Sequence, residues 1–172
     1  MNLSAQKYDN EYFERHSDGL KLCIELIRCT SQLDRIIDKN LRQEFGQSIS
    51  RFDLLAQLFR EGDQGLSVGE LGQRLISAKG NITGLINRMI KDDLLYKKAS
   101  KLDKRSFQVY LSKKGLTLFK NMADNHGSLI YKLFGSITRE NINDMTRLLS
   151  DVRSSLSITQ LKLVSEESKD NK

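Results

Sequence analysis

The chain has 172 residues, 38% hydrophobic and 29% charged, with no proline and a formal net charge of +6. This length and composition predict one folded domain with helical extensions, and exclude a set of independent domains or a chain too polar to fold. Two cysteines and two widely separated histidines are too few for a disulfide framework or a zinc site, so we expect no metal and no cofactor.

The sequence pattern of the N-terminal third of the chain predicts two helices. Apolar residues recur at helical spacing from Leu20 to Leu41, which predicts a long amphipathic helix. A second helix is expected after Ser50, a residue type that serves as an N-cap. The start of the chain lacks the apolar core of a signal peptide, and no stretch is long and apolar enough to span a membrane, so we expect a cytoplasmic location.

Serines mark the next two helix starts. Ser67 and Glu70 have the spacing of a capping box, in which each side chain accepts a hydrogen bond from the other residue's backbone N–H, and predict a short helix over 67–76. Ser77 can cap the following helix, which would end at Asp92. The buried side of that helix would hold Ile82, Leu85, Ile86, Met89 and Ile90.

A basic β-hairpin is expected next. Tyr96–Ala99 and Phe107–Leu111 are strand candidates, and lysines are frequent between them. Residues 77–115 contain ten lysines and arginines against three aspartates, so the positive charge of the chain is concentrated there. A solvated basic surface and a binding surface for a polyanion are both compatible with this charge.

The C-terminal part predicts two long helices, capped by Ser112 and Thr138. Apolar residues of the last helix alternate spacings of three and four, a seam that buries best against another helix. A domain of this size has little spare core to cover the seam. We therefore expect the seam to be a dimer interface, with packing inside the chain as the alternative. The expected interface residues are Leu22, Leu26, Ile142, Met145, Leu149, Val152 and Leu156.

The central order of three helices, strand, basic hairpin and strand is that of a winged helix-turn-helix, whose third helix enters the major groove of DNA. The expected fold is mainly α with a small β-hairpin wing. We divide the chain into an N-terminal arm and dimerisation helix (1–49), a winged helix-turn-helix domain (50–112), C-terminal dimerisation helices (113–160) and a polar tail (161–172). We expect the segment SEESKDNK (165–172) of this tail to be disordered.

The outer face of the third helix is polar once its apolar residues are turned inward. Asparagine and lysine can hydrogen-bond base edges, a threonine methyl can contact a thymine methyl, and glycine permits close approach to phosphate. The helix start also offers N–H groups to a phosphate. An ordinary solvated face is the alternative. The candidate DNA-binding residues here are Ser77, Lys79, Asn81, Thr83, Gly84, Asn87 and Arg88.

Several segments resemble the MarR-type family of multiple-antibiotic-resistance regulators, which are dimeric winged-helix proteins. They are SVGELGQRL (67–75), AKGNITGLINRMIKDDLL (78–95) and LDKRSFQVYLS (102–112), with the KKG that follows. The resemblance implies a transcriptional regulator that binds a pseudo-palindromic promoter site on double-stranded DNA as a homodimer. A repressor is the expected mode, although the sequence does not separate repression from activation.

The resemblance also assigns roles in the wing. The family's wing arginine enters the minor groove, and Arg105 is the residue that matches it. The family's acidic partner, which braces the wing, matches Asp103. Lys101 and Lys104 complete the expected DNA contacts of the wing.

Two positions depart from the family's pattern. Asp93 stands where the family usually has glycine, in the turn that leaves the third helix. Aspartate tolerates the left-handed conformation better than most residues, so we expect the turn to form. Gly72 stands where the family often has alanine, and the sequence assigns it no role.

Many members of this family release DNA when a small ligand, often aromatic and anionic, binds between the dimerisation helices and the winged domain. The resemblance implies an effector of this kind, such as an aromatic acid or its coenzyme A thioester. Other members sense oxidants through a cysteine of the first helix, where Cys23 and Cys29 both fall. Because a structural cysteine is usually inert, thiol sensing is the alternative.

An enzyme is not expected, because His16 and His126 have no paired nucleophile nearby and the sequence has no phosphate-binding loop. An alternative of a different class is a winged-helix interaction module that binds an acidic protein or RNA. Duplex binding that weakens steeply with salt would separate the two.

Overall fold

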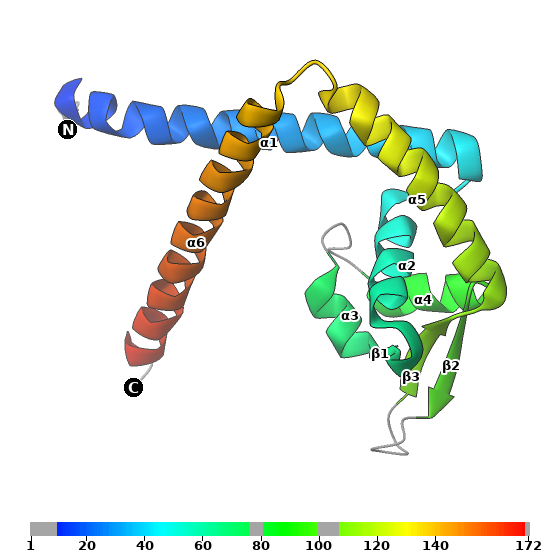
Figure 1. Ribbon diagram of the computed structural model, residues 1–172. Helices are drawn as coiled ribbons and strands as arrows, with labels where there is room; N and C mark the ends of the chain where they lie inside the picture. Colours follow the sequence, from blue (N-terminus) through cyan, green and yellow to red (C-terminus); the bar gives the residue numbers. More distant parts are fainter. Residues whose placement is uncertain (1–9, 76–80, 100–106, 171–172) are drawn as a thin grey trace, which may run out of the picture. The chain divides into compact units, whose positions relative to one another are not determined.

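The computed structural model describes residues 10–75, 81–99 and 107–170, with side chains over 17–75, 81–99 and 107–159. The chain divides into two units, residues 1–127 and 128–172, which we treat separately. The fold is mainly helical, as predicted (Figure 1). Its elements are α1 (Asn10–Phe45), α2 (Ile49–Glu61), the 3₁₀ turn η1 (Gly62–Gln64), β1 (Leu66–Ser67), α3 (Val68–Arg74), α4 (Ile82–Lys91), β2 (Leu95–Ala99), β3 (Phe107–Leu111), α5 (Lys113–Phe134) and α6 (Arg139–Asp170).

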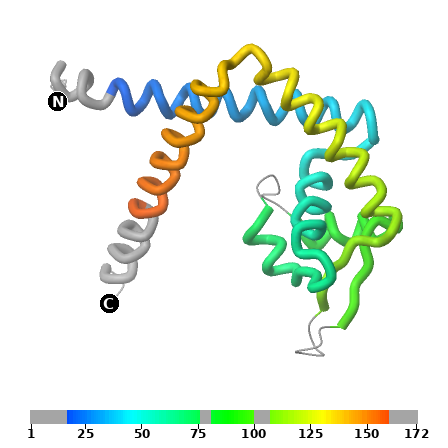
Figure 2. Tube along the Cα trace, in the orientation of Figure 1, coloured from blue at the N-terminus to red at the C-terminus, as the bar shows by residue number. Residues whose placement is uncertain are grey.

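A three-stranded antiparallel sheet in the order β1-β3-β2 completes the winged domain. β2 and β3 form the predicted hairpin, with Tyr96 opposite Tyr110. β1, which the sequence analysis did not predict, pairs Leu66 with Val109 of β3. A strand of two residues is too short to show an alternating pattern in the sequence, so β1 can be recognised only from its pairing with β3. The trace in Figure 2 runs from α4 directly into β2, and from β3 directly into α5.

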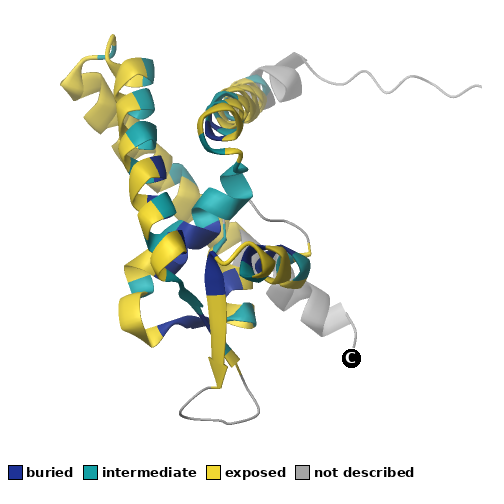
Figure 3. Ribbon diagram, turned by 90° about the vertical axis from the view of Figure 1, so that its right-hand side faces the viewer, coloured by how far each residue is buried: buried dark blue, intermediate teal, exposed yellow. Residues whose placement is uncertain are grey.

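The core of the winged domain is mainly aliphatic. Buried residues are concentrated there, whereas α1 is exposed along most of its length (Figure 3). Among the described residues, no helix is long and apolar enough to cross a membrane. The fully buried side chains include Leu54, Leu55 and Leu58 of α2, Leu71 of α3, Ile86 and Met89 of α4, and Val109 of β3.

Two predicted helix caps are wrong. Ser48, not Ser50, caps α2 and accepts a hydrogen bond from the Arg51 N–H. Asn81, not Ser77, caps α4. Serine and asparagine are comparable as caps, so the residue type marks a helix start only to within a few positions, and packing selects the residue used.

The other three caps are confirmed. Ser67 accepts from the Glu70 N–H, and the Glu70 carboxylate accepts in return from the Ser67 N–H, which holds the pKa of Glu70 below its ordinary value. Ser112 accepts from the Gly115 N–H at the start of α5. Thr138 does the same for Asn141 at the start of α6.

The prediction of disorder for SEESKDNK (165–172) is wrong as far as Asp170, because α6 continues to that residue. The segment SEESKDNK is polar and was therefore assigned to disorder. Glutamate and lysine, however, have high intrinsic helix propensity, and the chain has no proline to end the helix. Polarity alone therefore does not end this helix.

Asp38 joins α1 to α2. Burial alone raises the pKa of its carboxyl group, but hydrogen bonds from the Arg42 guanidinium and the Ile49 N–H outweigh it and hold the pKa below its ordinary value. A carboxyl group with a lowered pKa in the folded state stabilises the fold above its unfolded pKa of about 4, and this contribution is lost as the pH falls through the folded value.

We therefore expect Asp38→Ala to lower the free energy of unfolding by about 1 kcal/mol at neutral pH, because the start of α2 loses an acceptor and Arg42 loses its partner. Urea denaturation measures the difference from the wild type, which should shrink at about pH 3. Asp144→Ala, which removes an exposed partner of Arg147 on α6, is the control and should change stability little. An equal loss for both variants would contradict the account.

Candidate nucleic-acid interface

α4 has one buried face and one exposed polar face, as predicted. Leu85, Ile86 and Met89 are buried, whereas Ile82 and Ile90 are half-buried. Of the side chains predicted to contact DNA, Asn81, Thr83, Asn87 and Arg88 lie exposed on the opposite side, and Lys91 is exposed beside them. No large apolar side chain lies on this face between residues 81 and 91.

Two glycines shape the start of α4. A Cβ at Gly72 would lie 3.2 Å from Cδ1 of Ile82, so this glycine gives α3 room against the first residue of α4. This contact supplies the role that the sequence did not assign to Gly72. A Cβ at Gly84 would lie 2.7 Å from Nδ2 of Asn81, whose Oδ1 accepts from the Gly84 N–H at 2.7 Å. A Cβ at position 84 would therefore displace the capping amide of Asn81.

The end of α4 is tied to α2 and α5. Asp93 has a φ of 60°, the left-handed conformation expected of it. Its carbonyl accepts from the Ser112 hydroxyl at 2.6 Å, and the Asp92 carbonyl accepts from Lys114 Nζ at 2.8 Å. The Asp92 carboxylate pairs with Arg51 of α2. These contacts fix where α4 ends relative to the start of α5.

A side-chain hydrogen bond between described residues joins the wing to α4. Lys97 of β2 donates a hydrogen bond to Oδ1 of Asn87 at 3.1 Å. Sequence reasoning missed this pair, although the alternation of a strand places Lys97 on the same face of β2 as buried Leu95. That alternation is the signal that could have assigned Lys97 to the side of α4.

The opposite face of the hairpin carries an aromatic pair. The rings of Tyr96 and Tyr110 are stacked with centroids 5.3 Å apart, and Lys98 Nζ lies 5.1 Å and 5.6 Å from the two centroids. Gly65, with a φ of 66°, lies against the Tyr110 ring, where a Cβ would be only 2.6 Å away. The base of the wing is therefore held by packing on both faces.

The other predicted DNA contacts and the brace lie outside the described residues. Ser77 and Lys79 precede α4, and Lys101, Asp103, Lys104 and Arg105 belong to the loop between β2 and β3. The structure therefore brings together the α4 residues and adds Lys97 to them.

The residues predicted for a dimer interface remain largely exposed in the single chain. In the first unit, Leu22 is 50% exposed and Leu26 is half-buried. In the second unit, Ile142, Met145, Leu149 and Leu156 of α6 are exposed, and Val152 is half-buried. Cys23 and Cys29 of α1 are both exposed free thiols.

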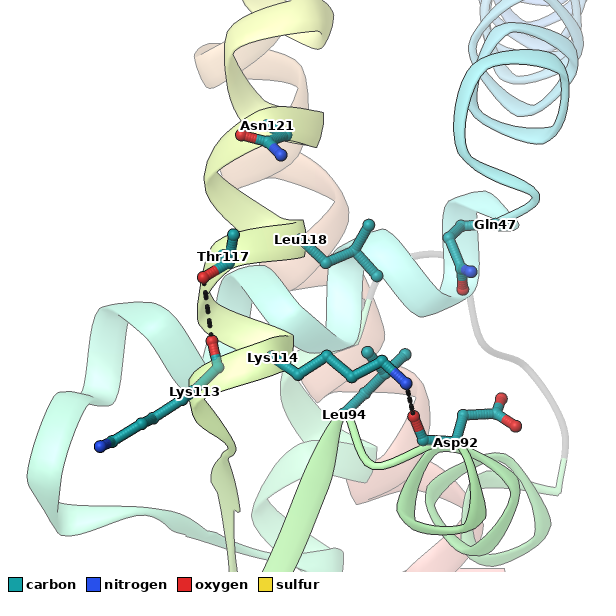
Figure 4. A pocket seen from close by; sticks show the side chains of 8 residues that line it. All are labelled: Gln47, Asp92, Leu94, Lys113, Lys114, Thr117, Leu118 and Asn121. Carbon is teal, nitrogen blue, oxygen red and sulfur yellow. Dashed lines mark hydrogen bonds between the residues drawn. The ribbon is translucent and has the colours of Figure 1, made fainter.

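A surface cleft of about 640 Å³ lies next to the end of α4. Its apolar wall is formed by Leu94 and Leu118, and Figure 4 shows Lys114 extending to Asp92 while Lys113 points in the opposite direction. The remaining lining residues are Gln47, Thr117 and Asn121. The cleft therefore combines apolar surface with the Lys114 ammonium group, the Asp92 carboxylate, two amides and a hydroxyl group.

The three helices α2, α3 and α4 with the β1-β3-β2 sheet form a winged helix-turn-helix, a fold class of DNA-binding proteins. The sequence model of the MarR family matches residues 45–106. The crystal structure of a MarR family transcriptional regulator from Silicibacter pomeroyi is similar, with 30% identity and a TM-score of 0.73 over 83% of this chain and 97% of that one. This chain belongs to the MarR family of transcriptional regulators, which are DNA-binding proteins and not enzymes.

A curated relative agrees with this assignment, and a further solved structure shares the fold. The HTH-type transcriptional regulator MhqR of Bacillus subtilis (strain 168) is 27% identical over 134 residues, which cover 78% of this chain and 90% of MhqR. The S. aureus MepR–DNA complex is 16% identical with a TM-score of 0.65, over 88% of this chain and 99% of that one. The likeness to MepR concerns the fold alone.

Proposed function

We propose that the protein binds a pseudo-palindromic promoter site as a homodimer in the cytoplasm and represses transcription there. The observation that carries the proposal is the exposed polar face of α4, which no large apolar side chain interrupts. A helix with such a face suits the major groove, where base edges differ in their hydrogen-bonding groups.

The proposal gives the predicted residues separate roles. Asn81, Thr83, Asn87 and Arg88 contact base edges, because they share the exposed face of α4. The residues around the helix start contact phosphates. These are Ser77, Lys79 and Gly84. In the wing, Arg105 enters the minor groove, Lys101 and Lys104 contact phosphates, and Asp103 braces the loop.

Titration of a labelled promoter duplex at several salt concentrations tests this proposal. A dimer that makes about six to ten phosphate contacts should lose about a thousandfold or more in affinity between roughly 50 and 200 mM salt. A single-stranded RNA of equal length and an acidic protein serve as competitors. Preferential binding of either competitor would instead support the interaction-module alternative.

The homodimer is supported by apolar surface in the second unit. Tyr131 at the end of α5 is 80% exposed and Leu156 of α6 is 64% exposed, and an apolar groove that includes Ile142, Met145 and Leu149 lies between the two helices. An exposed seam of this kind is stabilised by burial against a second copy.

We expect the double variant Met145→Glu and Leu149→Glu to be monomeric, because two carboxylates would have to be buried in the seam. Sedimentation velocity measures the mass. The double variant Arg147→Glu and Ser154→Glu, also on α6 but outside the seam, is the control and should remain dimeric. A dimer of unchanged affinity from the seam variant would contradict the proposed interface.

An effector is proposed to bind in the cleft beside the end of α4. Lys114 would attract a carboxylate, and Leu94 and Leu118 would contact an aromatic ring. Because Lys114 also holds the Asp92 carbonyl, a ligand that drew Lys114 away would loosen the end of α4 and release DNA. The neighbouring genes would indicate which aromatic acid or thioester to test.

Thiol sensing through Cys23 or Cys29 is the second candidate, favoured by the exposure of both thiols.

A further inference from the structure

The contact between the wing and α4 fixes the orientation of an asparagine on the DNA-facing side. Lys97 Nζ lies 3.1 Å from Oδ1 of Asn87. An ammonium group has donors and no acceptor, so it must face the amide oxygen. The NH₂ group of Asn87 is then the part of this exposed side chain that is left to contact a base.

The amide of Asn81, six residues earlier in the chain, is oriented in the same way. Its Oδ1 accepts from the backbone N–H of Gly84 at 2.7 Å, and a backbone N–H also cannot accept. Because Gly84 has no side chain, the amide lies close over the helix backbone. The oxygen of Asn81 therefore serves the start of α4, and its NH₂ group remains as the donor.

The other exposed side chains of α4 are mostly donors. Arg88 and Lys91 carry donors and no acceptor. Thr83 has a hydroxyl group, which donates or accepts. Within Asn81–Lys91, no carboxylate lies on this face, so the described part of the reading surface is dominated by N–H groups.

Base edges differ in how well they match such a surface. In the major groove, guanine presents two acceptors, N7 and O6, whereas adenine presents the N7 acceptor beside an amino donor and cytosine presents an amino donor. The bidentate contact of asparagine with adenine needs the amide oxygen as well as the NH₂ group. In Asn87 that oxygen already faces the Lys97 ammonium, which would also repel the amino group of adenine.

We propose that α4 reads acceptor edges, guanine above all, and that Lys97 is a positioning residue that sets this preference by holding Asn87. The inference rests on the proposed function, because it requires α4 to lie in the major groove. Lys97 itself need not contact a base.

Selection of duplexes from a random pool, with the wild type and with Lys97→Met, tests the proposal. The base pair read by Asn87 is identified as the one at which the Asn87→Ala variant loses its base preference. There the wild type should select guanine, and guanine-to-adenine replacement should weaken binding about fivefold or more. In Lys97→Met the same replacement should change affinity less than about twofold, because the amide can turn to adenine. Lys97→Arg keeps a donor and should keep the preference for guanine.

Lys98→Met is the matched control, since it removes the same charge from the same strand while Lys98 lies over Tyr96 and Tyr110. It should weaken all duplexes alike and leave the base preference unchanged. The proposal is overturned if Lys97→Met behaves in the same way, or if the wild type selects adenine at the Asn87 position. In both cases an inverted repeat would still be selected and the proposed function would stand. Selection of no sequence at all by the wild type would overturn the proposed function itself.

Discussion

Replacing Gly115 with alanine is expected to lower the free energy of unfolding by about 3 kcal/mol, because the new methyl group has no space. A Cβ at Gly115 would lie 2.0 Å from the carbonyl oxygen of Leu94. That oxygen cannot readily move, since it accepts a hydrogen bond from the Ser112 N–H at 3.0 Å. The first turn of α5, which contains Gly115, must therefore move away from Leu94, which immediately precedes β2.

Urea denaturation measures this loss, and Gly127→Ala provides the control within the same helix. No atom lies within 4 Å of a Cβ placed at Gly127. Alanine has the higher helix propensity, so the control should be more stable by up to about 1 kcal/mol. If Gly115→Ala is as stable as the wild type, α5 does not approach Leu94 as closely as described.

Arg88→Ala is expected to cost about 1–3 kcal/mol at the preferred site and much less on unrelated duplexes, because an arginine on the reading face discriminates between bases. Arg88 is exposed on the same side of α4 as Asn87, so its removal should not disturb the core. Fluorescence anisotropy with the preferred duplex and a scrambled duplex measures the two losses.

Lys101→Ala is the comparison for Arg88→Ala. As an expected phosphate contact of the wing, Lys101 should contribute similar affinity on every duplex, so its removal should leave the ratio between the preferred and scrambled sites unchanged. Equal losses on both duplexes for both variants would show that Arg88 does not read the sequence.

The order of elements and the faces of α4 were predictable because they depend on local patterns. The apolar spacing from Ile82 to Met89 assigned the inward side of the helix. The positive φ of Asp93 fits the resemblance, which implied a turn at a position where the family usually has glycine and aspartate is tolerated. The capping box at Ser67 was predictable for the same reason, since both of its hydrogen bonds lie within four residues.

The features that were missed depend on contacts between distant parts of the chain. β1 exists because Leu66 pairs with Val109, and the Arg51–Asp92 ion pair joins residues 41 positions apart. The contact of Lys97 with Asn87 likewise requires the hairpin to fold back beside α4. Spacing within one segment contains no information on such pairs.

A dimer of this chain is proposed to read an inverted repeat through α4, and a footprint on a selected duplex shows whether it does so. Two protected half-sites about one helical turn apart are expected, with both protections lost together in Arg88→Ala. A single protected half-site, or protection that spreads along the duplex without regard to sequence, would contradict the proposal.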